Sequence, residues 1–110
     1  MKLSGKSNME LTLGVAQALY VRIKDRPLQP GDQIVFSIRE DIDSPKLVDM
    51  IVTDFDAEGG ALISLQPADT AVLEEGSYVW GVNLIRYGRE PIDLIRSGRL
   101  KAKGAVASDE

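Results

Sequence analysis

The stretch from Leu62 to Leu84, LISLQPADTAVLEEGSYVWGVNL, constrains the fold of this chain more than any other segment. It predicts a strand, a connection with about one helical turn over residues 68–73, and a second strand that begins after Gly76. In this second strand Tyr78 and Trp80 share one face, because successive strand residues point to opposite sides of a sheet. A leucine and a glycine shortly before the tyrosine are typical of a tyrosine corner, in which the phenol hydrogen-bonds to the preceding loop of a β-sandwich.

Short alternations of apolar and polar residues, separated by turn residues, recur along the rest of the chain. This spacing predicts an all-β fold: a single immunoglobulin-like antiparallel β-sandwich of about seven to eight strands. The expected organisation is a flexible N-terminus at 1–8, the sandwich at 9–103 and a flexible tail at 104–110. The expected core contains the apolar faces of two strands: Ile34, Phe36, Ile38, Tyr78, Trp80, Val82 and Leu84. The last runs, 92–95 and 98–103, are expected to form a closing hairpin that turns at Ser97-Gly98.

Cysteine and histidine are both absent from the sequence. Disulfides, thiolate nucleophiles and the usual zinc frameworks are thereby excluded, and the commonest general base is missing. The net charge of −4 disfavours nonspecific binding to nucleic acid, which needs a basic surface. No run approaches the roughly 18 apolar residues of a membrane span, and residues 1–8 lack the apolar core of a secretory signal. We therefore expect no catalytic residue, no cofactor and no metal.

One acidic segment, residues 54–59 (DFDAEG), imitates the beginning of a calcium-binding loop. Asp54, Asp56 and Glu58 would supply oxygens at the first, third and fifth positions of that loop. The twelfth position would be Leu65, where such a loop needs a bidentate glutamate. We interpret the segment as a solvated hairpin turn.

A second acidic segment contains Glu40, Asp41 and Asp43. Paired carboxylates can serve in hydrolysis or metal binding. A polar loop between strands, ended by Ser44-Pro45, explains these residues without a substrate cleft, so the loop is the preferred interpretation.

Trp80 and Tyr78 raise the question of sugar binding, because aromatic rings stack on sugars. Their alternation with Val82 and Leu84 indicates instead that they fill the core. Tyr20 and Tyr87 are expected to be exposed, but two separated tyrosines are a weak carbohydrate signal.

Charge is distributed unevenly along the chain. Residues 40–75 contain ten acidic residues and one basic residue, whereas residues 86–103 contain six basic and two acidic residues. Alternation places the basic residues of 99–103 on the solvent side of the last strand, where they either keep an edge strand soluble or meet an acidic patch on another copy or partner. The candidate interface consists of Arg96, Arg99, Lys101 and Lys103. The acidic residues that these could face are Asp54, Asp56, Glu58, Glu74 and Glu75.

Three segments follow one another in an order that is typical of one family. A Pro-Gly-Asp turn leads into an apolar strand that ends in arginine (residues 30–39), and the segment from Leu62 to Leu84 comes next. The motif Leu-Ile-Arg-x-Gly-Arg-Leu of residues 94–100 completes the order. This order resembles the small β-sandwich domains encoded in phage and prophage genomes of Gram-positive bacteria, including the N-terminal domain of phage baseplate upper proteins. The resemblance covers residues 11–103 and implies a virion structural or attachment module that is not an enzyme.

The sequence therefore predicts a non-enzymatic virion structural or assembly module of a phage or prophage, acting through protein–protein interaction. Its expected partners are other virion proteins or further copies of the chain, and neither nucleic acid nor a membrane. It is expected to be made in the bacterial cytoplasm without a signal peptide and to become part of the virion. One alternative is a carbohydrate-binding module for attachment to cell-wall glycans, which exposed coplanar aromatic rings would favour. The other is a minor enzyme, which the missing histidine and cysteine disfavour and which a deep pocket lined by Asp or Glu would favour.

Overall fold

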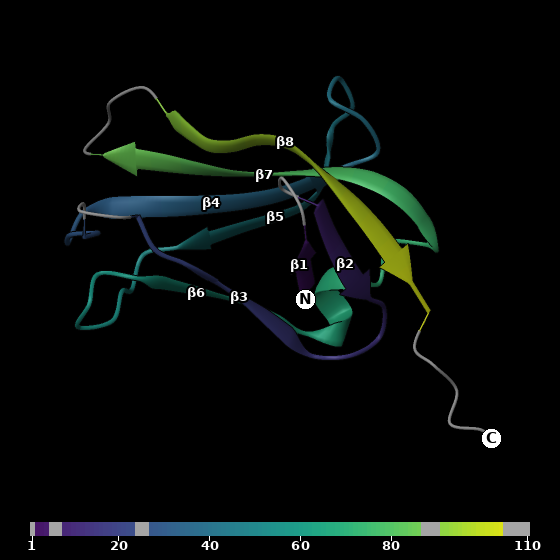
Figure 1. Ribbon diagram of the computed structural model, residues 1–110, viewed down its shortest axis with the longest axis horizontal. Helices are drawn as coiled ribbons and strands as arrows, with labels where there is room; N and C mark the ends of the chain where they lie inside the picture. Colours follow the sequence, from purple (N-terminus) through teal and green to yellow (C-terminus); the bar gives the residue numbers. More distant parts are fainter. Residues whose placement is uncertain (1, 5–7, 24–26, 87–90, 105–110) are drawn as a thin grey trace.

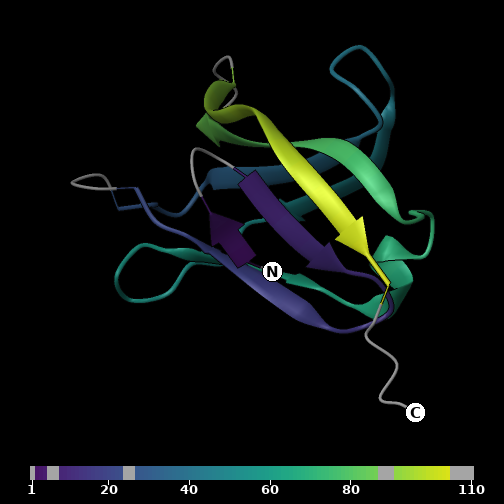
Figure 2. The ribbon, with the colours of Figure 1, turned by 45° about the vertical axis from the view of Figure 1, so that its right-hand side comes forward.

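The chain folds almost entirely into β-strands and the loops between them. The computed structural model describes residues 2–4, 8–23, 27–86 and 91–104, without the side chains of residues 2–4, 93 and 96. The strands of this part form two sheets, the larger above the smaller in Figure 1, and Figure 2 gives a second view. The larger sheet has the order β1 (Lys2–Ser4), β2 (Asn8–Thr12), β8 (Ile92–Lys103), β7 (Gly76–Arg86), β4 (Asp32–Arg39) and β5 (Lys46–Val52). The smaller sheet pairs β3 (Gln17–Val21) with β6 (Ala61–Leu65), and a 3₁₀ helix, η1 (Pro67–Thr70), follows β6. The predicted all-β sandwich with one short helical turn is confirmed.

The strand order is that of an immunoglobulin-like sandwich. In such a sandwich the second and fifth strands share one sheet, and the third, sixth and seventh strands lie together in the other. When β2 is counted as the first strand, these are β3 and β6, and β4, β7 and β8. Here β3 pairs with β6, while β4, β7 and β8 are neighbours in the larger sheet. One pair departs from the expected antiparallel pattern, because β2 runs parallel to β8.

The core lies between the inner faces of the two sheets. Strand alternation brings Trp80 of β7 against Phe36 of β4, with ring centroids 6.1 Å apart. Trp80 is 1% exposed and Phe36 is fully buried. Of the expected core residues Tyr78 is half-buried, and the others are buried: Ile34, Phe36, Ile38, Trp80, Val82 and Leu84.

The connection from β6 to β7 contains the predicted tyrosine corner. The hydroxyl of Tyr78 accepts a hydrogen bond from the backbone N–H of Glu74 at 2.9 Å and donates one to its carbonyl at 3.1 Å. At the start of η1 the Asp69 carboxylate accepts a hydrogen bond from the backbone N–H of Gln66 at 2.7 Å. This bond satisfies a backbone donor that the short helix leaves without an internal partner. These three hydrogen bonds fix the path along which the chain enters β7.

The predicted closing hairpin is wrong. Residues 92–103 form a single strand, β8, in which the backbone continues through Ser97-Gly98. Gly98 lies opposite Trp80, and the register of β7 with β8 shifts immediately beyond that pair. A glycine within a strand is as typical of a bulge or a close approach as of a turn, and here it occupies the irregular pairing beside the large indole.

Strand β8 is also not an edge of the sheet. It pairs with β7 on one side and with β2 on the other. Among the described residues the edges of the larger sheet are β1 and β5. The sequence did not predict β1, which pairs with β2. Arg99, Lys101 and Lys103 are exposed, as expected, but they lie on the face of an inner strand, so the interpretation that they keep an edge strand soluble is wrong.

Candidate interaction surface

A row of side chains crosses the outer face of the larger sheet. The register places Val79 of β7 directly between Arg39 of β4 and Arg99 of β8, and Asn8 of β2 lies beyond Arg99. Directly opposed residues on neighbouring strands have Cβ atoms about 4.5–5.5 Å apart. Two arginines therefore flank one half-buried valine on a sheet whose strands hold them in place.

A second row lies one pleat further along the same face. It consists of Ser77, Lys101 and Glu10, again in directly opposed positions. Beyond it Lys103 extends its ammonium group to 3.1 Å from a carboxylate oxygen of Glu10. Both side chains of this ion pair are about half exposed, so it contributes at most about 1 kcal/mol.

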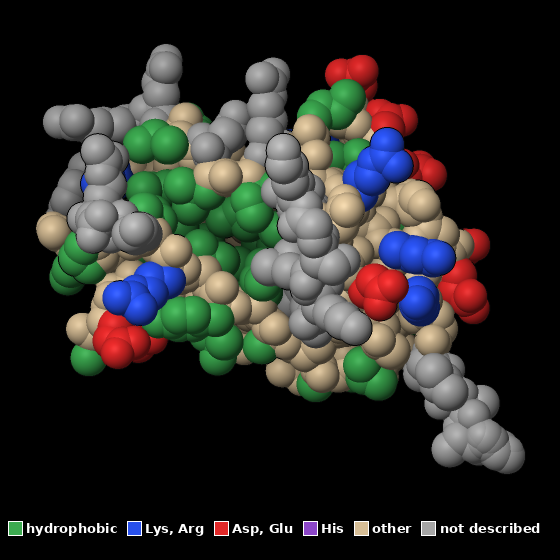
Figure 3. Space-filling model, in the orientation of Figure 1, with side chains coloured by type: hydrophobic (Ala, Val, Ile, Leu, Met, Phe, Trp, Pro, Cys, Tyr) green, Lys and Arg blue, Asp and Glu red, His purple; other side chains and the backbone are tan. Residues whose placement is uncertain are grey.

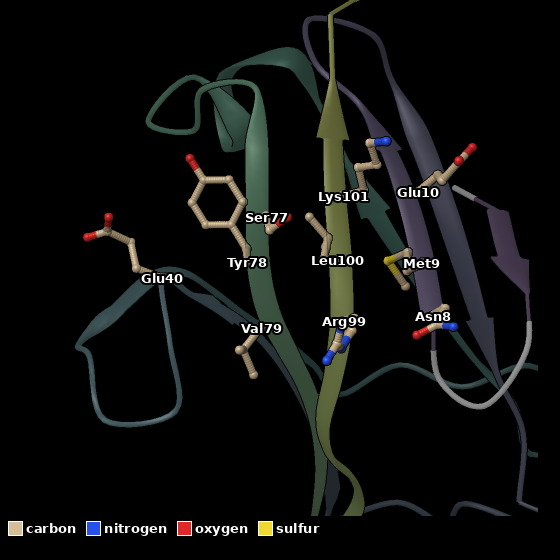
Figure 4. Close-up of a pocket in the computed structure, with 10 residues that line it drawn as sticks. All are labelled: Asn8, Met9, Glu10, Glu40, Ser77, Tyr78, Val79, Arg99, Leu100 and Lys101. Atoms are coloured by element: carbon tan, nitrogen blue, oxygen red, sulfur yellow. The ribbon is translucent and has the colours of Figure 1, made fainter.

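Apart from Arg39, which lines the adjoining hollow over Gly81, the residues of the two rows line a shallow hollow with a volume of about 470 Å³, which we call the basic groove. It lies over Ser77 and Val79 of β7 and over Arg99 and Lys101 of β8. Figure 4 shows Arg99 beside Val79 at one end of the basic groove and Lys101 towards Glu10 at the other. The side chains of Arg99 and Lys101 are exposed, and neither side chain has an ion-pair or hydrogen-bond partner among the described residues. Their charges are thus available to a ligand.

The loop after β4 forms one wall of this surface. The guanidinium of Arg39 donates to the backbone carbonyl of Ser44 at 3.0 Å, and the Asp41 carboxylate accepts from the backbone N–H of Asp43 at 3.0 Å. The candidate carboxylates of this loop are therefore turn residues, with Asp41 capping a backbone donor. Glu40 borders the basic groove, and the 51% exposed Ile42 borders a second, smaller hollow over Gly81.

The acidic residues expected to face the basic ones lie in two different places. Glu74 and Glu75 precede β7, and Glu75 lies beside Gly104 at the end of β8. They are thus near the basic residues in the same molecule. The turn that carries Asp54, Asp56 and Glu58 lies instead at the end of the molecule opposite the last residues of β8, on the left in Figure 1. The side chain of Arg96 lies outside the described residues.

Asp56 organises the acidic turn. One oxygen of its carboxylate accepts hydrogen bonds from the backbone N–H groups of Glu58 and Gly60, both at 2.9 Å. The other accepts from the Tyr20 hydroxyl at 2.6 Å. The Tyr20 hydrogen bond, followed by that of Gly60, holds the pKa of Asp56 below its ordinary value, and the same hydroxyl–carboxylate contact raises the pKa of Tyr20. Both oxygens are engaged by protein donors, as in a solvated turn.

Two exposed apolar side chains lie beside this turn. Ile51 of β5 is 58% exposed and Leu62 of β6 is 56% exposed. Both line a hollow that also contains Asp54 and Asp56. We call this surface, made of Ile51, Asp54, Asp56, Glu58 and Leu62, the acidic patch.

An apolar opening lies between the two sheets, on the side of β3 and β8. Val21, Ile23, Leu94 and Ile95 line it and are half-buried, and Trp80 forms part of its wall. Figure 3 shows apolar side chains gathered in a hollow on this face of the molecule. In the described part of the chain the smaller sheet has two strands against six in the larger, so it leaves part of the inner face of the larger sheet uncovered.

The aromatic side chains do not form an exposed platform in the described part of the chain. Trp80 and Phe36 are buried and Tyr78 is half-buried, whereas Tyr20 is 44% exposed and its hydroxyl is bound to Asp56. Tyr87 lies outside the described residues.

The sequence identified Arg99, Lys101 and Lys103 as one exposed set, and the structure places all three on the outer face. It missed Arg39, Val79 and Glu10, which complete the rows. Strand alternation could have assigned each of these to a face, but only the register across four strands brings them together.

Comparison with known protein families gives no matching family model, and comparison with curated proteins also gives no match. In the described residues no helix is long and apolar enough to cross a membrane, and no group of three or more acidic side chains is arranged to hold a metal ion.

Proposed function

We propose that this chain is a non-enzymatic interaction module that binds an acidic protein surface through the basic groove. The row Arg39–Val79–Arg99 is the observation that carries the proposal. Its two cations are set on paired strands, so little backbone ordering remains to be lost on binding. Val79 supplies apolar contact area between the two charges. Charged side chains on either side of an apolar contact favour orientation and specificity in protein recognition.

We further propose that the interaction takes place in a phage or prophage virion, as a structural or assembly contact. The support for this setting is the order of segments in the sequence, which resembles small virion sandwich domains. The immunoglobulin-like strand order agrees with that resemblance at the level of the fold. The proposed partners are other virion proteins or further copies of the chain, and the proposed site of synthesis is the bacterial cytoplasm.

Site-specific photo-crosslinking in the source bacterium tests both parts. A photoreactive residue is placed at Lys101 in the basic groove and, as a control, at Ala68, an exposed residue of η1 outside the groove. The crosslinked partner is then identified by mass spectrometry. The expected result is a crosslink from position 101 to a virion protein or to the chain itself, with a much weaker one from position 68. Equal crosslinking from both positions, or a partner unrelated to virions, would contradict the proposal.

A further inference from the structure

The chain itself carries an acidic surface, the acidic patch, of the kind that the basic groove is proposed to bind. Resting on the proposed function, we propose that the groove of one copy binds the acidic patch of a second copy of the same chain. The two surfaces differ, so the contact is head to tail.

The two surfaces are complementary in charge. At this place the outer faces of β2, β4, β7 and β8 carry four cations and one carboxylate, Arg39, Arg99, Lys101 and Lys103 against Glu10. Glu40, Glu74 and Glu75 border this face from the adjoining loops. The acidic patch carries three carboxylates, and the cation that acts on it is Arg22, whose charge lowers the pKa of Asp56. A contact between them brings opposite charges together, whereas groove against groove or patch against patch brings like charges together.

Each surface also has an apolar centre. In the patch, Ile51 and Leu62 are more than half exposed and border one hollow. In the groove, Val79 lies between two arginines, and Ile42 borders the adjoining hollow. Removal of these side chains from water supplies affinity, and the surrounding charges set the orientation.

The position of the two surfaces excludes a contact within one molecule. The acidic turn follows the last residues of β5, on the left in Figure 1, and the groove lies over the first half of β7 and the last half of β8, on the right. The molecule is 47 Å long along its longest axis. A head-to-tail contact repeats from copy to copy and closes into a ring or continues as a filament.

A pair of charge-reversed variants tests this contact. The groove variant carries Arg99→Glu and Lys101→Glu, and the patch variant carries Asp54→Lys and Glu58→Lys. All four side chains are exposed, and Asp56, which holds the turn, is unchanged. Each variant alone has two surfaces of like charge, whereas in an equimolar mixture every groove again meets a patch of opposite charge. Ala68→Glu, at an exposed position of η1 outside both surfaces, is the charge control.

Sedimentation velocity at low salt provides the readout, and circular dichroism checks that each variant is folded. We expect the wild-type chain and the control to associate, each reversed variant alone to bind itself at least about tenfold more weakly, and the mixture to recover the wild-type association. A mixture that stays monomeric while both variants are folded would overturn the proposal, and so would a wild-type chain that is monomeric at every concentration. In either case a crosslink from Lys101 to a different virion protein would leave the proposed function standing.

Discussion

Trp80 lies against Phe36 at the centre of the sandwich, with ring centroids 6.1 Å apart and ring planes inclined by 42°. The two residues come from β7 and β4, which also hold Val79 and Arg39 on the opposite face of the same sheet. The packing that stabilises the core therefore also fixes the spacing of the basic groove.

Replacement of Trp80 by alanine should lower the free energy of unfolding by about 3–5 kcal/mol, because it removes a buried large aromatic side chain and leaves a cavity. Urea unfolding followed by circular dichroism measures the change. Val79→Ala, at the next position but on the outer face, is the control and should cost about 1 kcal/mol or less. A loss below ~1 kcal/mol for Trp80→Ala would show that the core is not centred on this residue.

Tyr78→Phe should lower the free energy of unfolding by about 0.5–1.5 kcal/mol, the usual net contribution of one hydrogen-bonding group. The hydroxyl that this variant lacks is the one that contacts both backbone groups of Glu74. Ser77→Ala, an exposed neighbour, should change stability by less than ~0.5 kcal/mol. Equal effects of the two substitutions in the same unfolding experiment would argue against a stabilising tyrosine corner.

The contact between Tyr20 and Asp56 should make stability depend on pH. The pKa of Asp56 is lowered in the folded state, so its contribution is present above the unfolded pKa of about 4 and is lost as the pH falls through the folded pKa. The pKa of Tyr20 is raised, so its contribution is present below about pH 10 and is lost as the pH rises through the folded pKa.

Unfolding measured at a series of pH values checks this dependence. Tyr20→Phe removes the largest cause of the Asp56 shift and should flatten the decrease in stability below about pH 4. Asp54→Asn, which alters a neighbouring carboxyl without a hydrogen-bond partner among the described residues, should leave that decrease unchanged. Identical acid dependence in the wild type and Tyr20→Phe would contradict the assignment.

The sequence was sufficient to predict the features that depend on local spacing. Tyr78 and Trp80 are two residues apart and follow a leucine and a glycine. This spacing predicts both the tyrosine corner at Tyr78 and the core position of Trp80. Gly98 was misinterpreted because a turn and a bulge share the same local signal, and only the indole of Trp80 across the sheet distinguishes them.

The basic groove was only partly predictable. Arg99 and Lys101 are two positions apart on one strand, so alternation alone assigned them to one face. Arg39 is 60 residues away from Arg99 in the sequence, and its place in the row depends on the register of β4 with β7 and of β7 with β8. Long-range register is set by the packing of the whole core and is not encoded in any short segment.

The central claim is that the charges of the basic groove mediate recognition of an acidic surface. Sedimentation equilibrium of the wild-type chain at about 0.05 M and 0.5 M salt tests it most directly, because exposed charges are screened over about 10 Å at 0.1 M salt and over shorter distances as salt rises. We predict association at low salt that weakens markedly at high salt, and at both salts a weaker association when Arg99 and Lys101 are reversed to glutamate. Association that is indifferent both to salt and to this reversal would contradict the claim and would place the contact on an apolar surface elsewhere.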